Sequence, residues 1–183
     1  MRVFIAVELS GEQKNKLYEL QQAIKNAGME ANVVAKENIH ITLKFLGEIG
    51  ENDLEIVKNS LKEALEGVKS FQVSIKGVGA FPSMARPRVI WAGIEDGRDE
   101  LIELAGRIDE KVVVREFDKT PFSPHITVAR LKSERHVAAL EGIKRNFEEF
   151  EFGKTFVSEV KIRESRLSSG GPSYSDLYKA ALQ

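Results

Sequence analysis

The sequence HITL occupies residues 40–43, and the closely similar HITV occupies residues 125–128. The chain contains only three histidines, so it is improbable that two of them are followed two places later by a threonine by chance. The two copies lie 85 positions apart (125 − 40), close to half of the 183 residues. This spacing indicates that each half of the chain contributes one His-x-Thr segment.

The segments that precede the two motifs also match. RVFIAV begins at residue 2 and RVIWAGI begins at residue 88, 86 positions later (88 − 2), and both are rich in strand-forming residues. Each is followed by apolar residues at helical spacing and then by its His-x-Thr strand. The repeated order predicts an internal duplication. We therefore expect a single compact domain over residues 1–183, with pseudo-repeat lobes at approximately 1–87 and 88–183.

This order of elements favours an α+β fold. Each lobe should form an antiparallel-type sheet backed by helices, and the bilobal fold would place one His-x-Thr strand per lobe at a central cleft. Side chains two positions apart on a strand share a face. His40 therefore projects together with Thr42, and His125 together with Thr127. The apolar residues that alternate with them should face a core under the helices.

An imidazole beside a hydroxyl on each of two facing strands suits phosphodiester chemistry without a metal ion. The ordinary pKa of histidine, about 6.5, lets it give or take a proton near neutrality, and two histidines can divide these tasks. Threonine hydroxyls can donate to non-bridging phosphate oxygens as charge builds up on them. A single histidine in a strand is more often a packing or surface residue. The duplication of a polar face opposite an apolar face favours function here.

Two basic residues near the motifs are further candidates. Arg130 ends the second motif, and its guanidinium fork could hold a substrate phosphate. Strict alternation turns Arg130 away from His125, so the strand must bend or end there for Arg130 to contribute. Lys44 has the alternation of His40 and Thr42, which predicts that it shares their face.

The composition excludes several classes of protein. With 27 basic and 28 acidic residues, the net charge of −1 argues against a general nucleic-acid coat, although a local basic cleft remains compatible with it. The absence of cysteine excludes disulfides and thiol nucleophiles. No apolar run approaches the ~20 residues of a membrane span, so we expect a cytoplasmic protein without a membrane partner. No P-loop or complete dinucleotide-binding glycine motif is present, and we expect neither cofactor nor metal.

Five stretches carry a resemblance to a known family. They are MRVFIAVEL at 1–9, HITLKFLG at 40–47, FP at 81–82, PRVIWAG at 87–93 and PHITVAR at 124–130. Together they resemble the RNA 2′,3′-cyclic phosphodiesterases of the 2H phosphoesterase superfamily, a family that includes proteins also described as 2′-5′ RNA ligases. The resemblance covers nearly the whole chain. It implies a bilobal fold and the hydrolysis of a ribose 2′,3′-cyclic phosphate to a 2′-phosphomonoester.

The resemblance also implies roles for single residues. It makes His40 the proton donor and His125 the proton acceptor, although the symmetry of the motifs leaves these roles interchangeable on the residues alone. Thr42, Thr127 and Arg130 would bind the substrate phosphate. The substrate would be RNA with a 2′,3′-cyclic phosphate terminus, with tRNA fragments as one source, or a small cyclic nucleotide. We expect the protein to act as a monomer.

Two alternatives stay open at the level of sequence. The first is a 2′-5′ RNA ligase acting on tRNA-like ends, in which a ribose 5′-hydroxyl replaces water and the same histidines serve. The second is a non-catalytic module that binds RNA ends or nucleotides. The presence of both histidines and both threonines favours an enzyme over the binding module.

Overall fold

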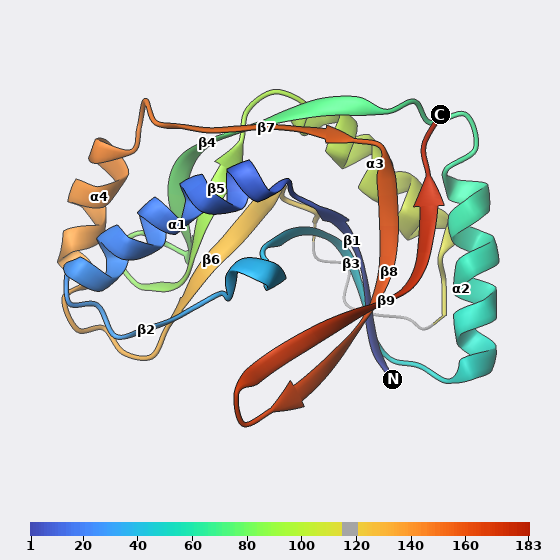
Figure 1. The fold of residues 1–183 in the computed structure, drawn as a ribbon, viewed down its shortest axis with the longest axis horizontal. Coiled ribbons are helices and arrows are strands. Elements are labelled where there is room, and N and C mark those ends of the chain that lie inside the picture. The colour runs from blue at the N-terminus through green and yellow to red at the C-terminus, as the bar shows by residue number, and fades with distance from the viewer. Residues whose placement is uncertain (115–120) are drawn as a thin grey trace.

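Two antiparallel sheets and the helices packed on them make up the structure, a computed structural model that describes residues 1–114 and 121–183 (Figure 1). The first sheet has four strands, β3 (His40–Glu48), β1 (Arg2–Glu8), β8 (Glu159–Ser168) and β9 (Gly171–Ala181), in that order. The second has five strands in the described residues, β2 (Ala31–Val33), β6 (His125–Leu131), β5 (Pro87–Ile94), β4 (Phe71–Pro82) and β7 (Glu151–Val157). The predicted α+β class is confirmed.

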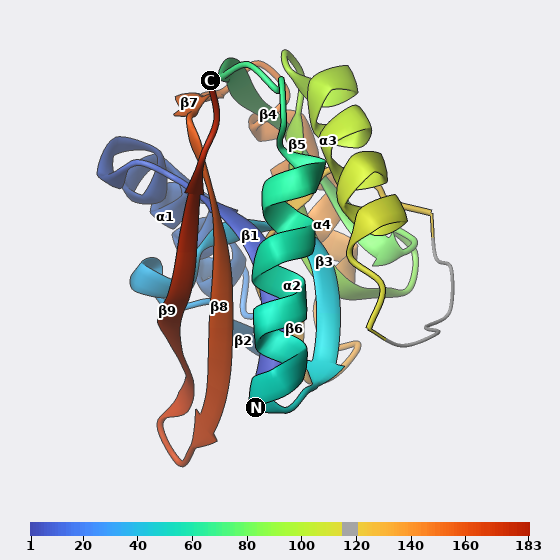
Figure 2. The ribbon, with the colours of Figure 1, turned by 90° about the vertical axis from the view of Figure 1, so that its right-hand side faces the viewer.

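The helices form two groups. Helices α1 (Gly11–Asn26) and α4 (Leu140–Asn146) pack on the second sheet, α1 against β6 and β7 and α4 against β4. Helices α2 (Glu51–Ala64) and α3 (Arg98–Lys111) pack on each other, with α3 also against β3 and α2 against β9. Figure 2 shows α2 and α3 side by side, and the β8–β9 hairpin extending beyond the body of the molecule. The remaining helical segments are the 3-10 turns η1 (Lys36–Asn38) and η2 (Val137–Ala139).

Each sheet takes elements from both halves of the chain. Strands β8 and β9, from the end of the chain, join β1 and β3, whereas β2 and β4 from the first half join β5 and β6. Helix α1 likewise packs on the second sheet, and α3 of the second half packs on β3 of the first. Neither sheet follows a division at residue 87. The division into pseudo-repeat lobes at 1–87 and 88–183 therefore stays a prediction from the sequence.

The ladders around the two His-x-Thr strands repeat with a constant offset. In the first sheet β1 and β3 form the pairs Phe4–Phe45, Ile5–Lys44, Ala6–Thr42, Val7–Ile41 and Glu8–His40. In the second sheet β5 and β6 form the pairs Val89–Arg130, Ile90–Ala129, Trp91–Thr127, Ala92–Ile126 and Gly93–His125. Every residue is 85 positions from its counterpart, as the motifs predict. The Arg-Val starts of the preceding strands suggest an offset of 86 positions instead. Aligning the strands at 86 would be a slip of one residue, which would move every side chain to the other face of the sheet.

A glycine on β4 determines where the indole ring of Trp91 lies. Trp91 of β5 pairs with Thr127, so its side chain is on the same face of the sheet as the second motif. A Cβ atom on Gly79 would overlap the indole ring, which shows that the ring occupies the place of a side chain on β4. Phe81, two residues further along β4, has its ring centroid 5.3 Å from that of Trp91. Gly79 therefore lets a large aromatic side chain lie beside the second motif.

Replacing Gly79 by alanine should destabilise the protein. The rigid indole and the new methyl group cannot occupy the same space, and overpacking of this kind costs about 1–3 kcal/mol. The control is Gly106→Ala in α3, where a Cβ meets nothing within 4 Å and where alanine should stabilise the helix by up to about 1 kcal/mol. Urea unfolding of both variants measures the difference. Equal stability of the two variants would contradict the overlap at Gly79.

Candidate active site

The two motif histidines form the same hydrogen bond to the backbone. Nδ1 of His40 lies 2.6 Å from the carbonyl oxygen of Asn38, and Nδ1 of His125 lies 2.7 Å from the carbonyl oxygen of Ser123. A carbonyl oxygen can only accept, so we assign the proton of each neutral ring to Nδ1. Nε2 is then the free nitrogen of both rings. It is the atom that can take up or give away a proton.

The neighbouring threonine contacts this free nitrogen in the first motif. Oγ1 of Thr42 lies 2.7 Å from Nε2 of His40, and with Nδ1 protonated the hydroxyl donates to Nε2. Thr127 occupies the corresponding position beside His125, on the same face of β6. The prediction that the alternating apolar residues face the core is confirmed, because all four are buried: Ile41, Leu43, Ile126 and Val128.

The two motifs meet where the two sheets adjoin. Strand β3 lies at one edge of the first sheet, and it contacts β6 of the second sheet (Figure 1). His40 begins β3 and His125 begins β6, and both side chains are partly buried. The structure thus places the two His-x-Thr strands next to each other although the motifs are 85 positions apart in the chain.

Burial shifts both histidines toward the neutral form. It lowers the pKa of His40 from 6.5 to about 4, and the charges of Arg163 and Lys14 act in the same direction, against the Asn38 carbonyl and Glu8. Burial also lowers the pKa of His125, with a further contribution from the charge of Arg130. Both rings are therefore neutral at pH 7 in the free protein, and each Nε2 is unprotonated.

Aromatic rings flank each histidine. The ring of His40 lies 5.0 Å from Phe4 and 5.4 Å from Tyr174 between centroids. The ring of His125 lies 4.9 Å from Phe81 in an edge-on arrangement and 6.5 Å from Trp91. These rings pack against the imidazoles and contribute to the burial that lowers the two pKa values.

One extra residue after each threonine changes the alternation of the strand. The pairing passes from Thr42 directly to Lys44 on β3 and from Thr127 directly to Ala129 on β6, while the partner strands advance by one residue. Leu43 is the extra residue on β3, and Val128 is its counterpart on β6. A β-bulge of this kind moves the side chains that follow it to the other face.

The bulge at Val128 places Arg130 on the face of His125. Arg130 is exposed, whereas Ala129 before it is fully buried. Its charge acts on His125, whose pKa it helps to lower. The bend in the strand that Arg130 would need in order to contribute is therefore present.

The bulge on β3 has the opposite consequence for Lys44. Nζ of Lys44 lies 2.6 Å from Oδ1 of Asp109 on α3, on the helix-covered side of the sheet. The prediction that Lys44 shares the face of His40 is therefore wrong, because strict alternation does not hold across a bulge. Phe45, 66% exposed, takes that face instead, at the position equivalent to Arg130.

A buried glutamine of α1 holds the second bulge. Nε2 of Gln21 donates to the carbonyl oxygens of Val34, at 2.8 Å, and Val128, at 2.9 Å. The backbone N–H of Val34 also donates to the Val128 oxygen, at 2.9 Å. Val34 lies in the connection from β2 to η1, which leads into the first motif at His40. The Gln21 amide therefore links the bulge of the second motif to the segment that leads into the first motif. No sequence pattern indicates this role.

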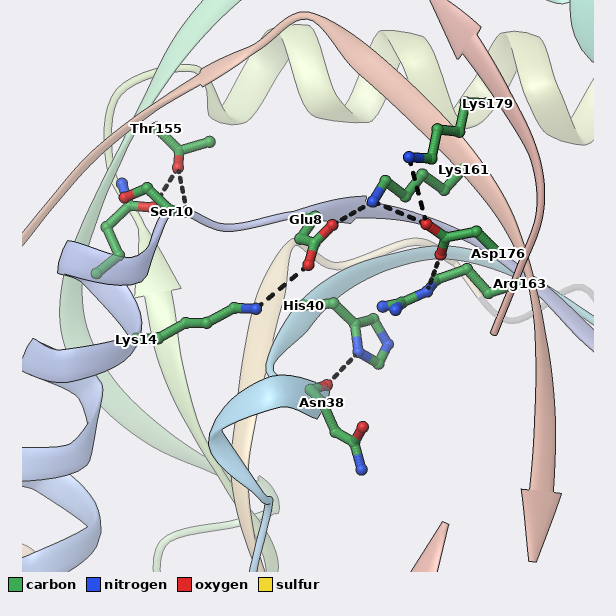
Figure 3. A network of polar contacts seen from close by, with 11 residues as sticks. Glu8, Ser10, Lys14, Asn38, His40, Thr155, Lys161, Arg163, Asp176 and Lys179 are labelled. Atoms are coloured by element: carbon green, nitrogen blue, oxygen red, sulfur yellow. Dashed lines mark hydrogen bonds and ion pairs between the residues drawn. The ribbon is translucent and has the colours of Figure 1, made fainter. Parts of the chain in front are cut away.

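The sequence also does not predict a wall of charged side chains beside His40, seen in Figure 3. We define this charged wall by its residues, Glu8, Lys14, Lys161, Arg163, Asp176 and Lys179. Along β8, Lys161 and Arg163 alternate with the buried Val160 and Ile162. That alternation is visible in the sequence, but nothing local indicates that β8 pairs with β1.

No group of three or more histidine, cysteine, aspartate or glutamate side chains in residues 1–114 and 121–183 is arranged to hold a metal ion. Within the same part of the chain, no helix is long and apolar enough to cross a membrane.

Comparisons with known proteins give a consistent set of relatives. The chain matches the family described as LigT like phosphoesterase over residues 7–91 and 93–174. It is similar to the RNA 2′,3′-cyclic phosphodiesterase of Methanothermobacter thermautotrophicus, with 33% identity, covering 97% of this chain and 96% of the relative. The protein of the same name from Archaeoglobus fulgidus is 35% identical, with 97% and 98% covered. A crystal structure of a protein from Thermus thermophilus has a TM-score of 0.79 at 28% identity, covering 100% of this chain and 98% of that one.

His40 should titrate near pH 4 in the free protein, well below the ordinary value of 6.5. Because its pKa is lower in the folded than in the unfolded chain, the unfolded chain takes up the proton first as the pH falls. Its contribution to stability is therefore complete above pH 6.5 and decreases as the pH falls toward about 4. NMR titration of the imidazole signals, assigned with a His40→Gln variant, measures this pKa. A value near 6.5 would show that His40 is not desolvated.

Proposed function

The chain belongs to the LigT-like phosphoesterase family, and on this basis we propose that it hydrolyses the 2′,3′-cyclic phosphate ends of RNA to 2′-phosphomonoesters. The observation that carries the proposal is the pair of imidazoles on adjoining strands, each with Nδ1 held by a backbone carbonyl and with an unprotonated Nε2, which in His40 accepts from Thr42. Two relatives of almost equal length are named RNA 2′,3′-cyclic phosphodiesterases. Their names support an enzyme rather than a non-catalytic module that binds RNA ends or nucleotides.

His125 acts as the proton acceptor in this proposal. Its Nε2 is unprotonated at neutral pH, as a general base requires, and it removes a proton from the attacking water. The water oxygen bonds to phosphorus on the side opposite O3′, and the P–O3′ bond breaks. The phosphate then remains on O2′ as a monoester.

His40 acts as the proton donor and protonates O3′ as it leaves. This role requires a protonated Nε2, whereas burial keeps His40 neutral in the free protein. A bound cyclic phosphate carries a negative charge, and an opposite charge nearby favours the protonated imidazole. Substrate binding thus prepares His40 for its role. The proton that His125 takes from water and the proton that His40 gives to O3′ balance over one turnover.

The remaining motif side chains bind the phosphate. The hydroxyls of Thr42 and Thr127 donate to non-bridging oxygens, on which charge increases in the transition state. Thr42 must then turn its proton from His40 to the substrate. Arg130 adds a guanidinium on the open face of β6, which suits bidentate binding of a phosphate.

The proposed chemistry does not by itself select one natural substrate. RNA ends, tRNA fragments included, and small cyclic nucleotides all contain the group that this chemistry needs. The monomeric state and the cytoplasmic location stay predictions, as does ligation through a ribose 5′-hydroxyl.

Variants His40→Ala and His125→Ala should each lose about 10²-fold or more in turnover of an oligonucleotide that ends in a 2′,3′-cyclic phosphate, because each removes one proton transfer. The assay contains excess chelator, and the product is identified as the 2′- or 3′-phosphate. His136→Ala is the matched control, since the third histidine packs against Gly28, away from both motifs. A 3′-phosphate product, or near-normal turnover by His125→Ala, would contradict the proposed mechanism.

Gln21→Met should raise KM by about tenfold with a smaller change in kcat, because losing the amide relaxes the bulge that carries Arg130 and weakens a charge-assisted contact to phosphate. The control is Gln13→Met, which removes another buried glutamine of α1, one that bonds to Thr155 on β7. In an Arg130→Ala background, Gln21→Met should change KM little further. Equal effects of the two glutamine variants on KM would refute the link through the bulge.

A further inference from the structure

The charged wall lies on the face of the first sheet that carries His40. Lys161 pairs with Ala6, which also pairs with Thr42, so both lie on the face of the first motif. Arg163 pairs with Phe4, whose ring is in contact with His40. Lys14 reaches the same place from α1. Three cationic side chains from two elements thus converge beside one histidine.

The cations of the charged wall exceed its carboxylates. Glu8 forms ion pairs with Lys14 and Lys161. Asp176 forms ion pairs with Arg163, Lys161 and Lys179. Four positive charges therefore face two negative ones.

Three of these four positive charges are held largely away from water. Lys14, Lys161 and Arg163 have side chains only 9–11% exposed, whereas Lys179 is mostly exposed. Uncompensated positive charge is costly at such burial, and an anion bound there would relieve the cost.

Arg163 is a buried cation with unused hydrogen-bonding capacity. The residue is 7% exposed, and its Nε lies 2.9 Å from Oδ1 of Asp176. The ring of Tyr174 lies 5.6 Å from its Cζ. Nε and Nη1 are both buried and have no hydrogen-bonding partner among the described residues, so the contact of Nε with Asp176 is an ion pair only. Figure 3 shows the guanidinium end turned toward His40, in agreement with its effect on that ring.

The charged wall is separate from the place where the reacting phosphate must lie. That phosphate has to reach Nε2 of both His40 and His125, and therefore lies between β3 and β6. Strand β8 is on the other side of β3, beyond β1, in the order β3-β1-β8-β9. An anion held by Arg163 would sit on the side of His40 away from His125. In an RNA end, the nearest anion other than the cyclic phosphate is the 5′-phosphate of the same nucleoside.

We propose that Arg163, supported by the charged wall, binds the 5′-phosphate of the terminal nucleoside, the group that joins it to the rest of the RNA. This inference rests on the proposed cyclic phosphodiesterase activity. It makes the enzyme selective for RNA ends over cyclic mononucleosides without a 5′-phosphate. The guanidinium donates to that phosphate from its Nη edge while Asp176 keeps its Nε in place.

The test compares two substrates that differ by one phosphate, adenosine 2′,3′-cyclic phosphate and its 5′-phosphorylated form. In the unaltered protein kcat/KM should be at least about tenfold higher for the 5′-phosphorylated substrate, the range of one charge-assisted hydrogen bond. Hydrolysis of neither these two substrates nor the oligonucleotide that ends in a 2′,3′-cyclic phosphate would refute the proposed function itself. Hydrolysis of the oligonucleotide alone would refute the 5′-phosphate site. Hydrolysis of both with equal kcat/KM would refute the 5′-phosphate site and leave the function intact.

Arg163→Gln should abolish most of this preference, measured as the ratio of kcat/KM for the two substrates, because any effect of the lost charge on His40 acts on both substrates alike and cancels in the ratio. Arg163→Lys, which keeps the charge, should retain part of it, and it also serves if the glutamine variant unfolds early in thermal melts. Arg166→Gln is the matched control, because Arg166 is on the same strand but is 75% exposed and paired with Glu164. Equal losses on both substrates in a folded Arg163→Gln protein, or an unchanged preference, would overturn the assignment.

Discussion

The antiparallel pairing of each His-x-Thr strand with its neighbour, interrupted by one extra residue after the threonine, is the constraint on which the rest of the site depends. The ladder places histidine and threonine on the open face, and the carbonyl two residues earlier fixes the imidazole ring. The extra residue then moves Phe45 and Arg130 onto that same face. A one-residue slip in either ladder would bury these side chains. The hydrogen bond from Gln21 to the carbonyl oxygen of Val128 acts at the point where the second ladder changes register.

The two motifs are equal in register but unequal in surroundings. The ring of His40 lies beside Phe4, Tyr174 and a wall of charged side chains, whereas the ring of His125 lies between two aromatic residues of the second sheet. Acid and base catalysis by two identical groups requires environments that push their pKa values apart. The duplicated register supplies two matched imidazoles, and the unequal neighbours make the two sites chemically different. Arg130 and Phe45, at equivalent positions, show the same divergence.

Local sequence pattern predicted the four motif side chains of this site because their orientation depends on strand alternation alone. The side chains at 40, 42, 125 and 127 project from the sheet as a period of two requires, and the apolar residues between them are buried. The prediction for Lys44 was wrong because alternation was carried through a bulge that no residue type in HITLKF marks. The positions of Arg163 and Asp176 could not be predicted from local pattern, for another reason. Each belongs to a strand near the end of the chain whose partners are set by sheet order.

The sequence by itself determined the 85-position repeat of the His-x-Thr motif, the α+β class, the family, and the His/Thr face opposite an apolar face, because these follow from residue types and from spacings read along one strand. Only the tertiary structure decided which other residues lie beside the two motifs. The bulges at Leu43 and Val128 are properties of a pair of strands, and neither strand specifies them alone. The place of Arg163 beside His40 depends on β8 pairing with β1 across most of the chain. Contacts of that kind arise from hydrogen-bond register and packing between distant segments, which local periodicity does not encode.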